Sequence, residues 1–390
     1  MENKPNKKNF SLLAAELECT NIMSSTSYIR LKVKTQVHFP RLGSSEVVHD
    51  RLSHSSEVGS SSLITSYSVA LSKGWDENAL DYNGSVKPCA LLHDIGHPPL
   101  GHDGAKFLDA YLKHAGLPEG FSDNNNNLVV IEQNDIHVSD YTISSVIKYP
   151  DKLYPDQKDK YCEILQKSLK DDFDYFSSLG VILSPQTRTI ACQIMDVSDE
   201  NTYINSDLAD FFCLGNTVPV DKLNAIASSY DVFIDNELYF EFLSVIASGN
   251  KNLIREYFNE NKNKMNMNYT LTQEGIVPVC PKLDAFKDFL WQVELKYYIS
   301  SVRLDPFHLE NMKKLRLYVS NVIHNNFVPS RSYADLISKA SCPTEVLRLK
   351  RDMIAATTDW FVTGFKDEAN DELGIVKGLD LGPDSTIQYN

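Results

Sequence analysis

Apolar residues recur at helical spacing along most of the chain. Between Glu57 and Lys73 they fall at Leu63, Tyr67 and Leu71, four residues apart. This spacing places them on one face of an α-helix. Three further segments show the same pattern: 103–115, which ends before Gly116, 187–212, and 344–365. The sequence therefore predicts a mainly α protein.

Runs typical of strands are few and short, at 37–39, 181–183 and 277–279. Two polar stretches interrupt the helical pattern. Asn124–Asn127 is predicted to be a loop, because four consecutive asparagines favour turns over helices. Residues 250–272 are rich in Asn and Lys, and we expect a mobile or variable insert there.

The chain shows no internal repeat and no long linker. We therefore expect a single large helical domain with helical appendages over residues 29–370. A short N-terminal segment, 1–28, precedes it, and a glycine-containing tail, 371–390, follows it.

Composition narrows the class of protein. With 390 residues, 42% of them hydrophobic, the chain is long and apolar enough to fold as a globular protein. A net charge of −14 argues against a broad basic surface for nucleic acid or anionic lipid. No apolar run approaches the roughly 20 residues that cross a bilayer. The seven cysteines form no CxxC pair and the N-terminus resembles no secretory signal, so we expect a cytoplasmic protein with reduced thiols.

Histidine and aspartate crowd into one short stretch of the chain. His93, Asp94, His97, His102 and Asp103 lie within eleven residues, between apolar residues and Gly-Pro turns. Imidazole nitrogen and carboxylate oxygen together suit a divalent metal ion. A structural hydrogen-bonded cluster is the alternative, but so dense a cluster favours a metal site.

A second acidic group begins at Asp199, roughly 100 residues after the cluster at 93–103. Asp199, Tyr203, Asp207 and Asp210 follow one face of a predicted helix, within about 80° of one another. Such a stripe is usually a solvated surface, but here the opposite flank is apolar, which favours a buried wall facing a cation. His54, at the start of another predicted helix, is on its own more often structural than a ligand.

Together these residues resemble the H…HD…D pattern of the HD-domain phosphohydrolases. Further segments match the deoxyguanosinetriphosphate triphosphohydrolase (dNTPase) branch of that superfamily in the family's order. They are RLKVKTQV at 30–37, RLSHSSEV at 51–58, HDIGHPPLGHDG at 93–104, FSDN at 121–124, KYP at 148–150, SDENTY at 198–203 and DMIAATTD at 352–359.

The resemblance implies an HD-domain helical fold and hydrolysis of a deoxynucleoside triphosphate to a deoxynucleoside and tripolyphosphate. It implies that one divalent metal, Mn, Mg or Fe, is held by His54, His93, Asp94 and Asp199. His102 and His97 would act in catalysis, His102 in proton transfer at the scissile oxygen. The implied contacts to the substrate are Gln36, Arg51, Asn124, Lys148, Tyr203 and Asp207.

Three positions depart from the family pattern. Ala105 stands where the family has a carboxylate that pairs with the histidine at 102, and Asp103 is predicted to point away from that histidine along the helix. Ile29 and Trp360 each replace a common arginine. These departures leave two alternatives open: an HD phosphohydrolase acting on nucleoside monophosphates or cyclic nucleotides, and a weakly active nucleotide-sensing scaffold. The resemblance also implies a homo-oligomer, a hexamer in many members, and regulation by an allosteric dNTP or single-stranded DNA.

Overall fold

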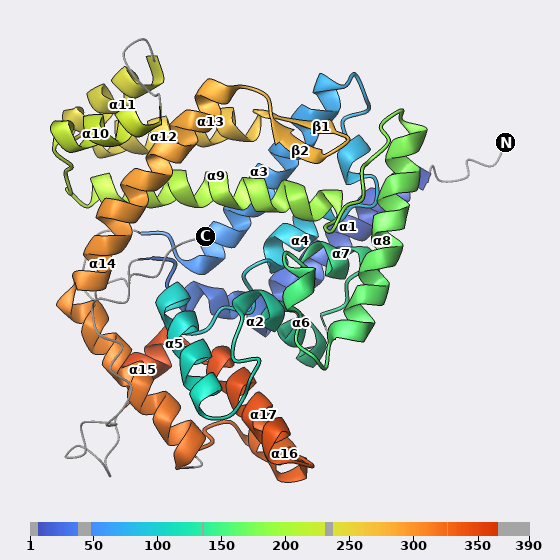
Figure 1. The fold of residues 1–390 in the computed structure, drawn as a ribbon, viewed down its shortest axis with the longest axis vertical. Helices are drawn as coiled ribbons and strands as arrows, with labels where there is room; N and C mark the ends of the chain where they lie inside the picture. Colours follow the sequence, from blue (N-terminus) through green and yellow to red (C-terminus); the bar gives the residue numbers. More distant parts are fainter. Residues whose placement is uncertain (1–6, 38–47, 135, 231–236, 326, 366–390) are drawn as a thin grey trace.

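A computed structural model describes residues 7–37, 48–134, 136–230, 237–325 and 327–365. The chain is mainly helical, as predicted (Figure 1). The predicted tail 371–390 and positions 38–39 of the first predicted strand lie outside the described residues. No helix in the described ranges is both long and apolar enough to span a bilayer.

The longest helix, α9 (Ile190–Cys213), runs across the middle of the molecule (Figure 1). It packs against α3 (Arg51–Ser72), α4 (Val86–Leu92) and α12 (Lys251–Asn266). Its first turns belong to one hydrophobic core, which includes Ile194, and its last turns belong to a second core, which includes Leu208. Asp199 therefore lies on α9 between the two cores.

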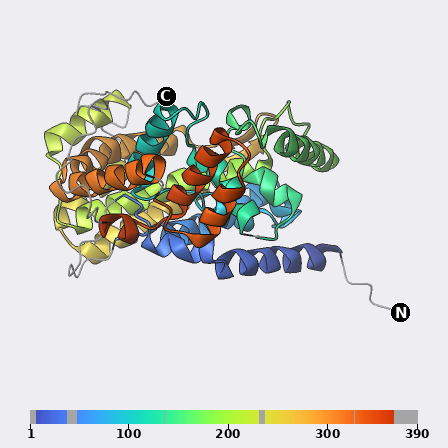
Figure 2. The same cartoon turned by 90° about the horizontal axis from the view of Figure 1, so that it is seen from below.

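The N-terminal half surrounds α4 and the first turns of α9. Helix α1 (Lys7–Ser24) lies along one edge of the molecule (Figure 2) and packs against α4. The other elements of this half are α2 (Thr26–Ile29), η1 (Arg30–Val33), η2 (Ala79–Asp81), α5 (Gly101–His114), α6 (Asp123–Gln133), α7 (Asp140–Ser145), η3 (Pro150–Lys152) and α8 (Lys158–Ser178).

The C-terminal half packs on α9 at one end and on α5 at the other. A third hydrophobic core joins α5 to α15 (Pro306–His324) and α17 (Pro343–Ala356), and it includes Phe107, Leu315 and Met353. The elements of this half are α10 (Val220–Ser229), α11 (Glu237–Ser248), β1 (Tyr269–Thr272), β2 (Gly275–Pro278), α13 (Pro281–Val293), the π-helical turn η4 (Glu294–Ile299), α14 (Ser300–Leu304), α15 (Pro306–His324), α16 (Arg331–Lys339), α17 (Pro343–Ala356) and α18 (Asp359–Thr363).

The four predicted helices are present. Those over 57–73, 103–115 and 187–212 correspond to α3, α5 and α9, and Gly116 follows α5 with a φ of 98° that favours glycine. The segment 344–365 forms two helices rather than one. It breaks at Thr357 and Thr358, whose extended backbone lets the Thr358 side chain cap α18.

Two expectations about irregular segments were wrong. Residues 181–183 form no strand, and the one sheet among the described residues contains only β1 and β2. Asn124–Asn127 is not a loop. Ser122 caps α6, and the amides of Asn126 and Asn127 hydrogen-bond the backbone of the loop that holds Gly96.

The stretch that was predicted to be a mobile or variable insert has regular secondary structure. Residues 250–272 form α12 and β1, and α12 buries Phe258 and Asn261 against α9. The predicted strand at 277–279 overlaps β2, which pairs antiparallel with β1. That 250–272 is a variable insert, and that the chain is divided at 28 and 370, stay predictions.

Candidate functional site

Two helix ends and the middle of a third helix position the four residues that were predicted to bind metal. Asp50 caps α3 through a capping box with Ser53, which places His54 in the first turn of that helix. His93 is the C-cap of α4, so Asp94 lies in the turn that follows it. Asp199 comes from the middle of α9.

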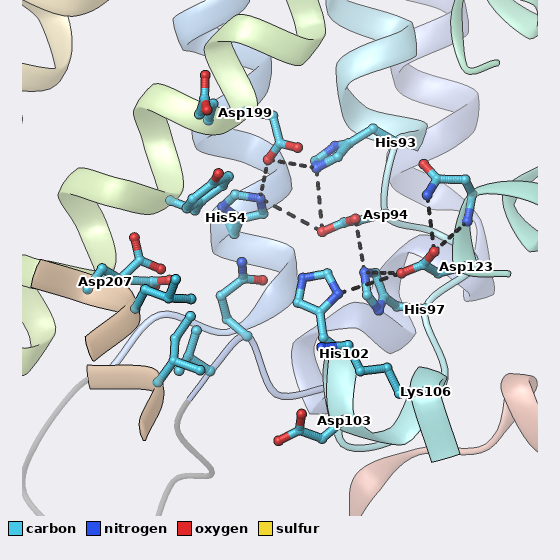
Figure 3. Close-up of a pocket in the computed structure, with 18 of the residues that line it drawn as sticks. His54, His93, Asp94, His97, His102, Asp103, Lys106, Asp123, Asp199 and Asp207 are labelled. Carbon is cyan, nitrogen blue, oxygen red and sulfur yellow. Dashed lines mark hydrogen bonds and ion pairs between the residues drawn. The ribbon is translucent and has the colours of Figure 1, made fainter. Parts of the chain in front are cut away.

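These four side chains converge on one point (Figure 3). The Asp199 Oδ1 atom lies 3.1 Å from His54 Nε2 and 3.4 Å from His93 Nε2. The Asp94 Oδ2 atom lies 3.4 Å from His93 Nε2 and 3.8 Å from His54 Nε2. Two imidazole nitrogens and two carboxylate oxygens at this spacing are a donor set that suits a divalent metal ion.

The electrostatics of this cluster favour the binding of a positively charged group. Burial would lower the pKa of His93, but Asp94 and Asp199 outweigh it and raise that pKa to about 10. Burial would raise the pKa of Asp94 and of Asp199, yet the neighbouring cationic groups hold both well below their usual range. His93 Nε2 is buried and makes no hydrogen bond within the described part of the chain. The residues present therefore fit a metal ion.

A second group of side chains adjoins the first. His97 Nε2 lies 3.3 Å from Asp94 Oδ1 and 3.3 Å from Asp123 Oδ2, and His102 Nδ1 lies 3.7 Å from the same Asp123 oxygen. Burial and then the nearby Arg51 lower the pKa of His97 to about 4, so this imidazole is neutral at neutral pH. Sequence reasoning gave no role to Asp123, which lies in the FSDN segment and immediately precedes the stretch 124–127 that was interpreted as a loop.

Asp103 points away from His102, as predicted. Its carboxylate accepts hydrogen bonds from Arg303 Nε and Nη2, the latter at 3.0 Å, and lies 3.2 Å from His308 Nε2. These partners hold the pKa of Asp103 below its usual range, against the effect of burial. Asp103 thus joins α5 to α14 and α15.

Both clusters open on one cavity of about 600 Å³. Of the predicted catalytic and substrate-contacting residues, it is lined by His97, His102, Gln36, Asn124, Lys148, Tyr203 and Asp207. Arg51 does not line it. Its buried guanidinium lies behind the site and contacts Asp94 and the backbone oxygen of Gln36.

Lys148 brings a fixed positive charge to the cavity beside the first cluster. Its Nζ lies 2.6 Å from Asp196 Oδ1 and 3.4 Å from Asp199 Oδ2. Burial would lower the pKa of Lys148, but Asp199 and Asp196 raise it above its ordinary value. Lys148 therefore stays protonated.

Two buried carboxyl groups lie at another part of the cavity wall. Asp207 on α9 and Glu294 at the start of η4 both line the cavity and are hydrogen-bonded to each other. Burial and then Asp210 raise the pKa of Asp207, and burial and then Asp207 raise that of Glu294. The pair therefore retains a proton at neutral pH. Glu294 and its neighbour Trp291 carried no sequence signal, because neither belongs to a recognisable pattern.

The three departures from the family pattern differ in their surroundings. Ala105 packs at the edge of the core around α5. The side chains of Ile29 and Trp360 are largely exposed, whereas Asp359 beside Trp360 is buried and accepts hydrogen bonds from the backbone N–H groups of Thr35 and Leu100.

No family model matches the chain. Curated proteins do resemble it. A deoxyguanosinetriphosphate triphosphohydrolase-like protein of Shewanella oneidensis is 26% identical over 239 residues, 50% of this chain and 53% of that protein. A second one, from Mesorhizobium japonicum, is 30% identical over 227 residues, 52% of this chain and 46% of that protein.

The chain therefore spans about half the length of these two relatives. A longer match joins it to a protein of the same description from Histophilus somni, 26% identical over 352 residues, 71% of this chain and 78% of that protein.

Proposed function

We propose that this chain, a distant homologue of the deoxyguanosinetriphosphate triphosphohydrolase-like proteins in the dNTPase branch of the HD-domain superfamily, is a metal-dependent dNTP triphosphohydrolase. It converts a deoxynucleoside triphosphate to a deoxynucleoside and tripolyphosphate. One observation carries the proposal: His54, His93 and Asp94, with Asp199 beside the two histidines, open directly on a cavity of about 600 Å³, a size that suits a nucleotide.

His54, His93, Asp94 and Asp199 would hold the metal, for which we propose Mn, Mg or Fe. A metal held there would supply Lewis-acid chemistry and would lower the pKa of a water molecule for attack at the α-phosphorus. Arg51 keeps Asp94 ionised and oriented from behind, since its guanidinium contacts the Asp94 carboxylate outside the cavity.

Cationic and neutral donors of the chain bind the phosphates. Lys148 stays charged in its buried position and faces the cavity next to Asp199. His97 is neutral, and its single N–H, on the Nε2 that faces Asp94 and Asp123, fixes the ring at the phosphate end of the cavity. His102, which lines the cavity and whose side chain is 65% exposed, gives a proton to the 5′ oxygen as the deoxynucleoside leaves.

The sugar lies against α9. Tyr203 packs under C2′ of the deoxyribose and leaves no room for a 2′-hydroxyl. Asp207 contacts the 3′-hydroxyl, and Gln36, whose Oε1 atom is buried without a hydrogen bond, accepts a hydrogen bond from the same end of the sugar. Asn124 lies beside Asp123 at the phosphate end of the cavity.

The test is a product analysis. Each of the four dNTPs and the matching ribonucleotides is incubated with the protein and Mn²⁺ or Mg²⁺, and products are separated by anion exchange. We expect deoxynucleoside and tripolyphosphate in equal amounts. His93→Ala abolishes the reaction, whereas His114→Ala, which changes an exposed histidine on α5, leaves it unchanged. If none of the dNTPs yields tripolyphosphate, the proposal is wrong.

The same assay separates the alternatives. Orthophosphate released from nucleoside monophosphates, or a linear monophosphate from a cyclic nucleotide, would favour a different HD phosphohydrolase. Tight dNTP binding without any product would favour a nucleotide-sensing scaffold. From the homology we also infer a cytoplasmic homo-oligomer, a hexamer, with dNTP or single-stranded DNA as effector. Mass photometry with and without each effector tests this assembly.

A further inference from the structure

His102 has no carboxylate partner on its own helix. It lies in the first turn of α5, and Ala105, one turn further on, has no polar side-chain atom. Asp103 is bound by Arg303 and His308, which come from α14 and α15. A histidine that transfers protons works best when a second group fixes its orientation and stabilises its charged form. Any such partner of His102 must therefore come from another element.

Asp123 on α6 is in the required position (Figure 3). Its Oδ2 atom faces both imidazoles, 3.7 Å from His102 Nδ1 and 3.3 Å from His97 Nε2. Its Oδ1 atom accepts hydrogen bonds from the backbone N and the Nδ2 of Asn124, at 2.9 and 3.1 Å. One oxygen thus anchors the carboxylate while the other is turned to the histidines.

The start of α6 is fixed to the loop after His93. The Gly96 N–H donates to Asn127 Oδ1 and Asn126 Nδ2 donates to the Gly96 oxygen, each at 2.7 Å. The two backbones are so close that a Cβ on Gly96 would lie 2.3 Å from the Asn127 nitrogen. Asp123 therefore cannot shift without moving the loop that carries His93 and Asp94.

The charge of Asp123 also suits the role. Burial would raise its pKa, but His97 and His102 hold it below its usual range. An ionised carboxylate beside Nδ1 keeps the Nδ1–H of His102 directed at Asp123 and leaves Nε2 for the substrate.

We propose that Asp123 is the positioning carboxylate of His102 and supplies from α6 the group that Ala105 lacks on α5. This rests on the proposed function. As the bond between the α-phosphorus and the 5′ oxygen breaks and the bond to the water oxygen forms, the Nε2 proton of His102 passes to the 5′ oxygen. The attacking water releases one proton to solvent, its remaining O–H becomes part of the tripolyphosphate, and a proton from solvent restores the Nε2–H of His102.

A second metal ion at His97, His102 and Asp123 is the competing explanation, because the three ligand atoms lie within 4.8 Å of one another. The position of Arg51 argues against it. This guanidinium contacts Asp94 and is close enough to lower the pKa of His97, so a second dication would lie against a fixed positive charge.

Two measurements test the proposal, and the first needs no turnover. Histidine ¹⁵N–¹H spectra of the metal-loaded protein, with His102 assigned from a His102→Ala sample, report which ring nitrogen carries the proton. In the wild type we expect neutral His102 to carry its proton on Nδ1. In Asp123→Ala we expect that preference to be lost. Asp140→Ala, which removes an exposed carboxylate from the first turn of α7, leaves the spectrum unchanged.

The second measurement is steady-state kinetics. Asp123→Ala is expected to lower kcat about 100-fold, the lower end of the effect of a positioned general acid, with KM changed less than about threefold. Adding Ala105→Glu to that variant places a carboxylate on α5. We expect the kcat of the double variant to recover to at least about a tenth of the wild-type value. A merely structural role of Asp123 would not be rescued from another helix.

Either of two results overturns the proposal: a neutral His102 in the wild type that carries its single proton on Nε2 instead of Nδ1, or wild-type kcat in Asp123→Ala. Loss of one of two bound metal equivalents in Asp123→Ala, measured by elemental analysis, would also overturn it in favour of a second metal site. If the wild type turns over no dNTP, the proposed function fails, while the spectra still decide whether Asp123 orients His102.

Discussion

Substituting Asp199 should remove most of the stabilisation of the fold by a divalent metal. The Asp199 carboxylate lies within 3.4 Å of Nε2 in both His54 and His93. Substitution by Asn keeps the size of the side chain but removes the negative charge. Because the site is assembled from α3, α4 and α9, a metal ion bound there stabilises the native state and not the unfolded chain.

The size of the effect follows from linkage. At a metal concentration 100 times the Kd, binding stabilises the native state by about 2.7 kcal/mol. For 390 residues the entropy of unfolding is about 0.8 kcal/mol/K, so the Tm rises by about 3 °C. If Asp199→Asn weakens binding about 100-fold, the same metal concentration adds only about 0.4 kcal/mol, or half a degree.

Differential scanning calorimetry with and without Mn²⁺ measures this shift. Asp196→Asn is the matched control, because Asp196 lies one turn earlier on α9 and pairs with Lys148 and Arg188 but not with the histidines. We expect it to keep the full metal-induced shift. A wild-type protein without a shift, or an Asp199→Asn protein that retains it, would refute the assignment of the ligands.

Three further predictions follow from the site and its supports. The pKa of Asp207 is raised to about 8, so the native state holds a proton that the unfolded chain releases near pH 4, and the Tm falls as pH rises from about 4 to 8. Glu294→Gln should make that fall smaller, and an unchanged slope of Tm against pH would contradict the shared proton. Tyr203→Ala should raise the relative rate on ribonucleotides about tenfold in competition assays, since it opens space at C2′; unchanged selectivity would exclude Tyr203 as the steric barrier. Gly96→Ala should destabilise the fold by about 2 kcal/mol or more in urea unfolding, because its Cβ would meet the backbone of Asn127 at 2.3 Å; wild-type stability would contradict that contact.

Local patterns predicted the helices whose periodicity is strong and uninterrupted. The spacing of apolar residues was sufficient for α3, α5 and α9, because each buries a continuous stripe. It failed at α6, where asparagine amides are buried by pairing with a loop from elsewhere in the chain. No local pattern reports such a tertiary hydrogen bond.

The same distinction applies to the site. His54, His93, Asp94 and Asp199 were selected from motifs, and the fold brings them together. The structure places the buried Arg51 behind Asp94 instead of in the cavity, which spacing alone did not indicate. Asp123 and Glu294 were not recognised, because the partner of each is a side chain on a different helix. Asp123 faces His102, and Glu294 interacts with Asp207.

The most direct test of the central claim is hydrolysis of a dNTP in H₂¹⁸O, with mass spectrometry of both products. Attack by water at the α-phosphorus predicts one ¹⁸O atom in tripolyphosphate and none in the deoxynucleoside. Label in the deoxynucleoside, or products other than these two, would contradict the claim that this site is a dNTP triphosphohydrolase.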